Sequence, residues 1–384
     1  MESDFRESSP QTKRPKHSHP QPSHLSLKNN TTASSQKAIA AHYNSIQRNL
    51  NERSNSTILG LRSFNNFIKA TLLQLHCRPL DSNGTVVLDL CCGKGGDLRK
   101  FLSLSIRHYV GADHAHLSIN DAVSRFNSLK HKPFSAQFIV ADCHSNDLSH
   151  VNKAWFDICS CQFALHYAFE TRHSAEMLIK NACGQLKSGG VFLVTMPDAD
   201  RIMRNVRVRA SESNVVGAKE IEFGNSVYKI RFLGNKSCTF PYFCVSPNEP
   251  FGVKYNFNLE DAIEDCPEYI VPLITLQQLL LKHGVLLERR QSFHEFAIDA
   301  LHNEEFQQLM HRMKVFGTDG VCDEQQWEAI GLYQILVFRK LTLDELKQRN
   351  LVEQATLFKQ PDNNFKQEIF KPKTIDQSDI IALS

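Results

Sequence analysis

The sequence predicts an α/β fold built around a mostly parallel β-sheet. Five short apolar runs alternate with helix-like segments between residues 81 and 195, which is the pattern of repeated strand–helix–strand units. Polar side chains gather directly after these runs, where open α/β sheets bind their ligands. The predicted strands are Val86–Leu90, Tyr109–Asp113, Phe138–Ala141, Phe156–Cys161 and Val191–Thr195.

The loop after the first predicted strand, residues 91–97 (CCGKGGD), carries three glycines and leads into a helical segment. Glycine has no Cβ, so such a loop lets the backbone approach a nucleotide-like ligand closely. Lys94 lacks the spacing of a phosphate-binding P-loop, and Leu98 stands where a dinucleotide loop would have its third glycine. We favour the D-x-x-x-G-x-G loop of an S-adenosylmethionine (SAM) site starting at Asp89, while a dinucleotide site and a ligand-free turn stay open.

Acidic or amide side chains lie at or just after the ends of the next three predicted strands. Asp113 is placed to accept hydrogen bonds from both ribose hydroxyls, a feature that SAM and dinucleotides share. Asp142 follows the third strand, where methyltransferases have an acid near the adenine amino group. Gln162 follows the fourth strand, with His166 and Tyr167 shortly after it. The spacing therefore predicts one site along the carboxyl edge of the sheet.

Composition limits the function further. Lys and Arg outnumber Asp and Glu by only 44 to 41, for a formal net charge of +3, so any nucleic-acid contact must be a local basic patch. The 11 cysteines form no C-x-x-C pair, which argues against zinc, and their odd number favours a reducing compartment. No apolar run is long enough for a membrane span, and none near residue 1 suits a signal peptide.

The sequence divides into three parts. Residues 1–36 are rich in Ser, Pro, His, Gln and Asn and are expected to form a disordered tail, in which 13–16 (KRPK) match a nuclear import signal. Residues 37–340 form the predicted domain, and 341–384 form an extension with a short helix and a flexible tail. A polar stretch at about 200–270 interrupts the α/β alternation, and we expect it to be an insertion that sets substrate specificity.

Further elements complete the predicted domain. Residues 38–75 follow a helical pattern whose apolar stripe, from Phe64 to Leu75, is expected to pack on the core. Within the insertion, residues 219–232 alternate around a Gly-Asn turn, as a β-hairpin does. The last elements are a helix at 276–282 and strands at 285–288 and 332–338.

Several short motifs together point to one protein family. The most specific are Asn-Asn-aromatic-x-Lys at 65–69 and Cys-Gln-Phe-x-x-His-Tyr at 161–167. The others are 42–44 (HYN), 61–64 (LRSF), the glycine loop, 156–160 (FDICS), 223–225 (FGN) and 252–259 (GVKYNFNL). In these segments, residues about 41–340 resemble the eukaryotic mRNA cap guanine-N7 methyltransferase family. The resemblance implies a Rossmann-like, seven-stranded methyltransferase sheet with an inserted cap-binding lobe.

The resemblance implies SAM as the methyl donor. Lys69 matches the residue that reaches the methionine carboxylate, and Cys91 stands where many relatives have glycine and approach SAM through the backbone. Gln162 and Tyr167 match residues beside the reacting centre. The implied SAM-binding residues are Lys69, Cys91, Gly93, Asp113, Asp142, Gln162 and Tyr167.

The resemblance also implies capped RNA, GpppN-RNA, as the methyl acceptor. Glu268 matches the acid that accepts hydrogen bonds from guanine N1 and N2, and three cations match positions facing the cap and its triphosphate. The implied cap-binding residues are Asn65, Asn66, Lys94, Lys100, Arg125, His166, Glu268 and Tyr333.

The chemistry calls for no catalytic acid or base. Guanine N7 has a free lone pair and no proton to lose, so the rate should come from holding N7, the methyl carbon and sulfur in line. His114 and His116 stand near Asp113, where relatives often have a second acid. Further ligands are not evident around these two histidines, so no metal is expected.

Rival functions remain at this stage. They are a SAM-dependent methyltransferase of another substrate, a cap- or RNA-binding module without activity, and, more weakly, a dinucleotide oxidoreductase. We expect a nuclear protein that is a monomer and has no membrane partner. Subunits of the capping machinery or activating subunits remain possible partners.

Overall fold

The computed structural model describes residues 56–80, 84–151, 154–212, 220–233, 250–316, 322–355 and 373–383. The predicted tail 1–36 with its import signal, the 42–44 motif and the first part of the predicted helix therefore lie outside the described residues. Within these ranges, no helix has the length and apolar character needed to cross a membrane.

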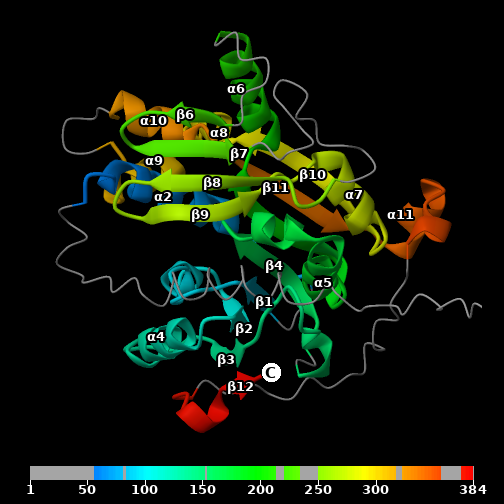
Figure 1. Cartoon of the computed structure of the whole chain (residues 1–384). Coiled ribbons are helices and arrows are strands. Elements are labelled where there is room, and N and C mark those ends of the chain that lie inside the picture. Colours follow the sequence, from blue (N-terminus) through cyan, green and yellow to red (C-terminus); the bar gives the residue numbers. More distant parts are fainter. Residues whose placement is uncertain are drawn as a thin grey trace, which may run out of the picture.

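An eight-stranded sheet carries the fold, in the order β10-β11-β5-β4-β1-β2-β3-β12 (Figure 1). β1 pairs in parallel with β2 and β4, whereas β11 runs antiparallel to β5 and β10. All seven predicted strands are present, so the predicted α/β class is confirmed. The strands are β1 Thr85–Leu90, β2 Ile106–Asp113, β3 Ser135–Val140, β4 Phe156–Gln162, β5 Leu186–Pro197, β10 Val285–Ser292, β11 Tyr333–Lys340 and β12 Ile381–Ala382.

The eighth strand corrects the expectation of a flexible C-terminal tail for residues 373–383. β12 pairs in parallel with β3, and the side chain of Asn127 donates to the backbone oxygen of Ile375 at 2.7 Å and accepts from its N–H at 2.9 Å. The free backbone groups of an edge strand attract such pairing, and the polar composition of the extension concealed it. β5 begins at Leu186 rather than at the predicted Val191, and it includes Gly189, which has φ +80°.

Helices cover both faces of the main sheet. Val87 of β1 belongs to one apolar cluster with α2 and α4, whereas Val86 and Leu88 belong to a second with α5 and α7, as expected for side chains that alternate across a strand. The predicted stripe of α2 is confirmed from Phe64 to Leu72. The helices are α2 Leu59–His76, α3 Leu98–Phe101, α4 His116–Asn127, α5 Arg172–Cys183, α6 Ala199–Glu212, α7 Leu273–Leu281, α8 Phe293–Ala300, α9 Glu304–Arg312, α10 Glu324–Ile330 and α11 Leu343–Gln348.

The insertion forms a second, antiparallel sheet, in the order β6-β7-β8-β9 (Figure 1). The predicted hairpin is confirmed as β6 Glu220–Gly224 and β7 Tyr228–Leu233, and β8 Lys254–Leu259 and β9 Ile263–Tyr269 extend it. We predicted neither β8 nor β9, and the acids and the proline of β9 are poor strand formers.

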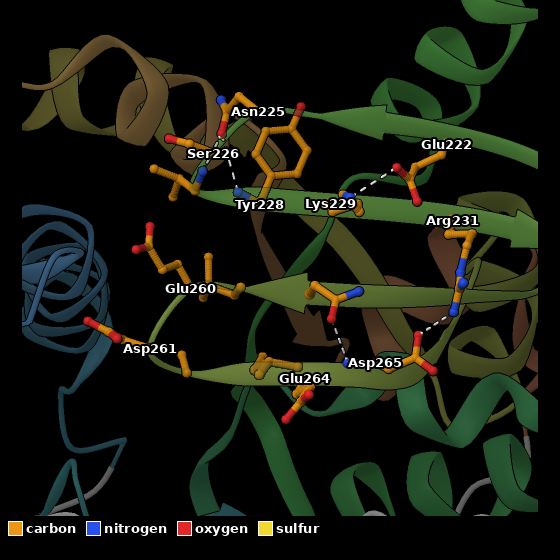
Figure 2. A pocket seen from close by; sticks show the side chains of 15 residues that line it. Glu222, Asn225, Ser226, Tyr228, Lys229, Arg231, Glu260, Asp261, Glu264 and Asp265 are labelled. Atoms are coloured by element: carbon orange, nitrogen blue, oxygen red, sulfur yellow. Dashed lines mark hydrogen bonds and ion pairs between the residues drawn. The ribbon is translucent and has the colours of Figure 1, made fainter.

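A hollow of about 930 Å³ lies on the outer side of this second sheet (Figure 2). Its two cations are already paired, Lys229 with Glu222 at 3.1 Å and Arg231 with Asp265 at 2.7 Å. Its other charged lining residues are all acids, and no predicted site residue is among them. An acidic surface repels a polyanion, so we place the site elsewhere.

Candidate active site

The carboxyl ends of the parallel strands bring the predicted SAM residues to one edge of the sheet. Asp113 pairs with Val140, two positions before Asp142, and Gln162 pairs with Thr195 on β5. The glycine loop leaves β1 between β2 and β4, where the connections diverge in opposite directions across the sheet. Such a switch point is the usual ligand position in open α/β sheets.

The glycine loop has the backbone geometry that its sequence predicts. Gly93 and Gly95 have φ values of +52° and +67°. A Cβ on Gly95 would come within 3.0 Å of the Ala122 Cβ, so this glycine lets the loop pack on α4. A Cβ on Gly93 would meet no atom within 4 Å, so its backbone faces open space. This open face fits the close approach of a cofactor.

Cys91 also lies in the left-handed region, with φ +56°. A side chain there costs on the order of 1 kcal/mol, because Cβ approaches the following carbonyl. We expect Cys91→Gly to unfold at higher urea than Cys91→Ala, by about 1 kcal/mol in the free energy of unfolding. The neighbouring Cys92 has no positive φ, so Cys92→Ala should be more stable than Cys92→Gly. The same order at both positions would contradict the strain at Cys91.

Asp113 fastens the glycine loop to the end of β2. Its carboxylate accepts the N–H of Gly93 at 2.8 Å and the N–H of Ala115 at 2.8 Å. Burial raises the pKa of Asp113, although these two hydrogen bonds oppose the rise. The remaining lone pairs of the two oxygens stay available to ribose hydroxyls.

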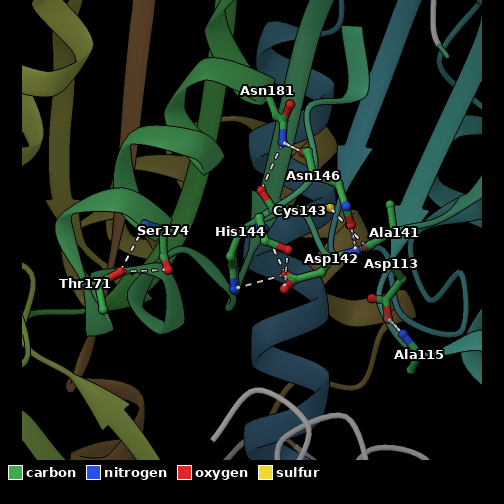
Figure 3. A network of polar contacts seen from close by, with 11 residues as sticks. Asp113, Ala115, Ala141, Asp142, Cys143, His144, Asn146, Thr171, Ser174 and Asn181 are labelled. Carbon is green, nitrogen blue, oxygen red and sulfur yellow. Dashed lines mark hydrogen bonds and ion pairs between the residues drawn. The ribbon is translucent and has the colours of Figure 1, made fainter. Parts of the chain in front are cut away.

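Asp142 starts a rigid turn after β3 (Figure 3). It accepts the His144 N–H at 2.9 Å and the Ser145 hydroxyl at 2.8 Å. The side chain of Asn181 on α5 donates to the backbone oxygens of Cys143 at 2.9 Å and Asn146 at 2.8 Å. Burial lowers the pKa of His144 despite Asp142 nearby, which keeps the ring neutral. The predicted adenine-side residue is thus held by its own loop and by α5.

A network of two lysines and one acid joins α2 to the glycine loop. Asp97 contacts Lys69 at 2.8 Å and Lys100 at 2.6 Å, and Lys100 also donates to the Asn66 side chain at 3.1 Å. Burial alone would raise the pKa of Asp97, but the two lysines outweigh it and hold that pKa well below its usual value. Asp97 was not predicted as a site residue, although it is the last residue of the glycine loop at 91–97.

The same network affects a second buried acid. Burial and the nearby Asp97 raise the pKa of Asp89 to about 7, against the hydrogen bond that the Tyr109 hydroxyl donates at 2.8 Å. Asp89 lies in β1, directly before the glycine loop, and its side chain is buried, with only 2% of the residue exposed.

Gln162 is oriented by its neighbours. The Thr195 hydroxyl donates to its Oε1 at 3.0 Å, and its Nε2 donates to Ser160 at 3.0 Å. The next residue, Phe163, has φ +59°, a strain typical of functional sites, and its ring lies 5.2 Å from that of Tyr333. Neither Thr195 nor Phe163 was predicted as a site residue, because only the folded chain brings Thr195 next to Gln162 and Phe163 next to Tyr333.

A buried polar group lies between the main sheet and the second sheet. The His166 Nε2 is 3.4 Å from the Glu268 Oε1, and the Tyr255 hydroxyl donates to Glu268 at 2.6 Å. His166 and Glu268 are only 2% and 3% exposed, and neither ring nitrogen of His166 makes a hydrogen bond with a described residue. Burial and Glu268 raise the pKa of Tyr255 far above 10, so it remains a donor. Glu268 therefore keeps acceptor capacity for a ligand.

The remaining predicted residues have fewer contacts with one another. Lys94 pairs with Asp121 of α4 at 2.9 Å, and Arg125 follows one turn later on that helix. The Asn65 side-chain oxygen is buried and has no hydrogen-bond partner in the described chain. In the same ranges, no group of three or more His, Cys, Asp or Glu suits a metal ion.

The comparisons identify the family. A family model described as the mRNA (guanine-N(7))-methyltransferase domain matches residues 26–341. The chain belongs to this family. Its relatives include the mRNA cap guanine-N(7) methyltransferase 1 of Oryza sativa subsp. japonica, 41% identical over 323 residues, covering 80% of this chain and 82% of that protein. The Saccharomyces cerevisiae mRNA cap guanine-N(7) methyltransferase is 34% identical over 315 residues, covering 79% and 70%.

In this mRNA cap guanine-N7 methyltransferase, the contacts gather the predicted residues into two sets. The predicted SAM set centres on Asp113 and Gly93, and the predicted cap set centres on His166 and Glu268. Asn65 stays outside both sets, because its side-chain oxygen has no hydrogen-bond partner among the described residues. The roles of the individual residues stay predictions.

Proposed function

We propose that the chain transfers a methyl group from SAM to N7 of the 5′-terminal guanosine of GpppN-RNA, without a general base. The observation that carries the guanine assignment is the buried Glu268 carboxylate. It is held by Tyr255 and lies beside His166, with acceptor capacity left for two N–H donors on one edge of a base.

SAM fits the edge formed by the glycine loop and the ends of β2, β3 and β4. The open face of Gly93 admits the cofactor, Asp113 suits its ribose and Asp142 its adenine. Lys69, which is paired with Asp97 at 2.8 Å, is the proposed cation for the methionine carboxylate. Cys91, Gln162 and Tyr167 are the other residues proposed to contact the methionine part of SAM. SAM supplies a methyl group activated by a sulfonium charge.

The cap occupies the space between the two sheets in this proposal. Glu268 accepts from guanine N1 and N2, and His166 and Tyr333 enclose the base. The proposed cations for the triphosphate include Lys94, which pairs with Asp121, and Lys100, which pairs with Asp97. The proposed cap residues are Asn65, Asn66, Lys94, Lys100, Arg125, His166, Glu268 and Tyr333.

Positioning supplies the rate in this mechanism. Holding the nucleophile and the methyl carbon in line contributes on the order of 7–11 kcal/mol. The reaction moves positive charge onto the guanine, and a carboxylate on the guanine edge stabilises that charge. Glu268 therefore both binds the base and favours the transition state. We propose that the enzyme acts in the nucleus and that it is a monomer.

Methyl transfer to three acceptors tests the proposal. GpppA-RNA should be methylated. GTP should react poorly, because no RNA is attached to its triphosphate. The acceptor m7GpppA-RNA should not react, because its N7 already carries a methyl group. Equal methylation of m7GpppA-RNA would reveal another target atom. Binding of the cap without any transfer would indicate an inactive binding module instead.

A further inference from the structure

A second groove, of about 440 Å³, runs along α2 outside the predicted SAM site. One wall is a stripe of α2 that contains Ser63, Asn66 and Gln74. From Ser63 to Gln74 this stripe is about 16 Å long at 1.5 Å per residue. The groove is thus an extended channel on the surface, long enough for a polymer segment.

The groove shares two residues with the proposed cap site. Asn66 and Lys100 both line it, and their side chains are hydrogen-bonded to each other at 3.1 Å. The groove therefore adjoins the proposed position of the cap triphosphate, the point at which an RNA chain would leave the cap.

The charge of the groove suits a polyanion. The guanidinium of Arg99 is exposed and makes no hydrogen bond or ion pair with any described residue. No carboxylate is among the lining residues, all of which the structure describes. Arg99 is thus a free cation beside Lys100, in contrast to the paired cations of the outer hollow.

The uncharged lining also suits a nucleic-acid backbone. Ser63 offers a hydroxyl, a group that commonly contacts phosphate and sugar oxygens, whereas the Ser103 hydroxyl donates to the Lys100 backbone oxygen at 3.1 Å and the Gln74 amide donates to Glu305. A Cβ on Gly96 would meet nothing within 4 Å, so the backbone lies open on this wall. The groove is lined by no aromatic ring on which a base could stack, and its far side is aliphatic and thioether surface, such as Met313.

We propose that this groove binds the sugar-phosphate backbone of the nucleotides that follow the cap, without sequence preference, and that Arg99 is its principal phosphate contact. The inference rests on the proposed function, because the cap fixes where the RNA enters. It makes Arg99 a determinant of affinity for RNA but not of methyl transfer to the cap itself.

The test compares the dinucleotide GpppA with short GpppA-capped RNA as methyl acceptors. For Arg99→Ala, the KM for capped RNA should rise about tenfold, the usual loss for a contact to a charged group, with kcat unchanged. The KM for GpppA should stay at its original value. The slope of log KM against log salt for RNA should fall by about 0.7, the value for one single-strand phosphate contact. Arg207→Ala, which removes an equally exposed arginine from α6, should change none of these values.

Three outcomes would overturn the inference. The first is an equal KM for GpppA and capped RNA in the unmodified enzyme, and the second is an unchanged salt slope in Arg99→Ala. The third is a charge-reversing Arg99→Glu variant that melts normally and methylates capped RNA normally, which would leave the groove to a protein partner. Failure of the unmodified enzyme to methylate capped RNA at all would instead refute the proposed function.

Discussion

Replacing Glu268 by alanine is expected to lower kcat/KM for cap methylation about 100- to 10,000-fold, while the affinity for SAM stays unchanged. The variant loses two hydrogen bonds from guanine to a charged acceptor, each worth about 1.5–3 kcal/mol, and each 1.36 kcal/mol is tenfold in rate. Glu268 is buried beside His166, so water cannot replace it as an acceptor. Methyl-transfer kinetics and calorimetric titration with adenosylhomocysteine measure the two effects separately.

A matched acid and a modified cap make this prediction specific. Glu264→Ala changes an exposed acid of the same strand and should leave both quantities unaltered. A cap with inosine in place of guanosine lacks the N2 donor, so the original enzyme should discriminate against it and Glu268→Ala should not. Equal discrimination by both enzymes, or a parallel loss of SAM affinity, would refute the guanine role.

Replacing Asp113 by alanine should have the opposite profile, with SAM affinity reduced about 100-fold or more. Two charge-assisted hydrogen bonds to the ribose are lost. The N–H groups of Gly93 and Ala115 also lose their acceptor, so the glycine loop loses its attachment to β2. Titration with adenosylhomocysteine measures the affinity. Raising the SAM concentration toward saturation should restore part of the methylation rate.

The amide variant separates these two contributions. Asp113→Asn retains one acceptor for the loop but loses the charge, so its affinity should lie between those of the original enzyme and Asp113→Ala. Asp299→Ala removes an exposed acid from α8 as the control. An unchanged affinity in Asp113→Ala would show that the ribose binds elsewhere.

The parts that sequence predicted well are those governed by local pattern. Apolar runs ending in Asp113 and before Asp142 gave the parallel strands, because a run buried on both faces is visible without its neighbours. The motif at 161–167 placed Gln162, His166 and Tyr167 at the end of the fourth strand; Gln162 is the last residue of β4, and the other two follow it.

The parts that escaped prediction depend on contacts between distant segments. Thr195 of β5 orients Gln162 of the neighbouring strand β4. The ring of Phe163 packs against that of Tyr333, which lies far later in the sequence. The pairing of β12 with β3 joins residues far apart in sequence. The periodicity of a sequence does not predict such contacts. The role of Asp97 likewise became visible only in the fold, where α2 places Lys69 beside it.

The most direct test is a crystal structure of the protein with adenosylhomocysteine and GpppA bound. The ribose should lie on Asp113 and the N1–N2 edge of guanine on Glu268, with N7 turned toward the sulfur. A guanine that faces away from Glu268, or adenosylhomocysteine bound away from the carboxyl edge of the sheet, would contradict the account.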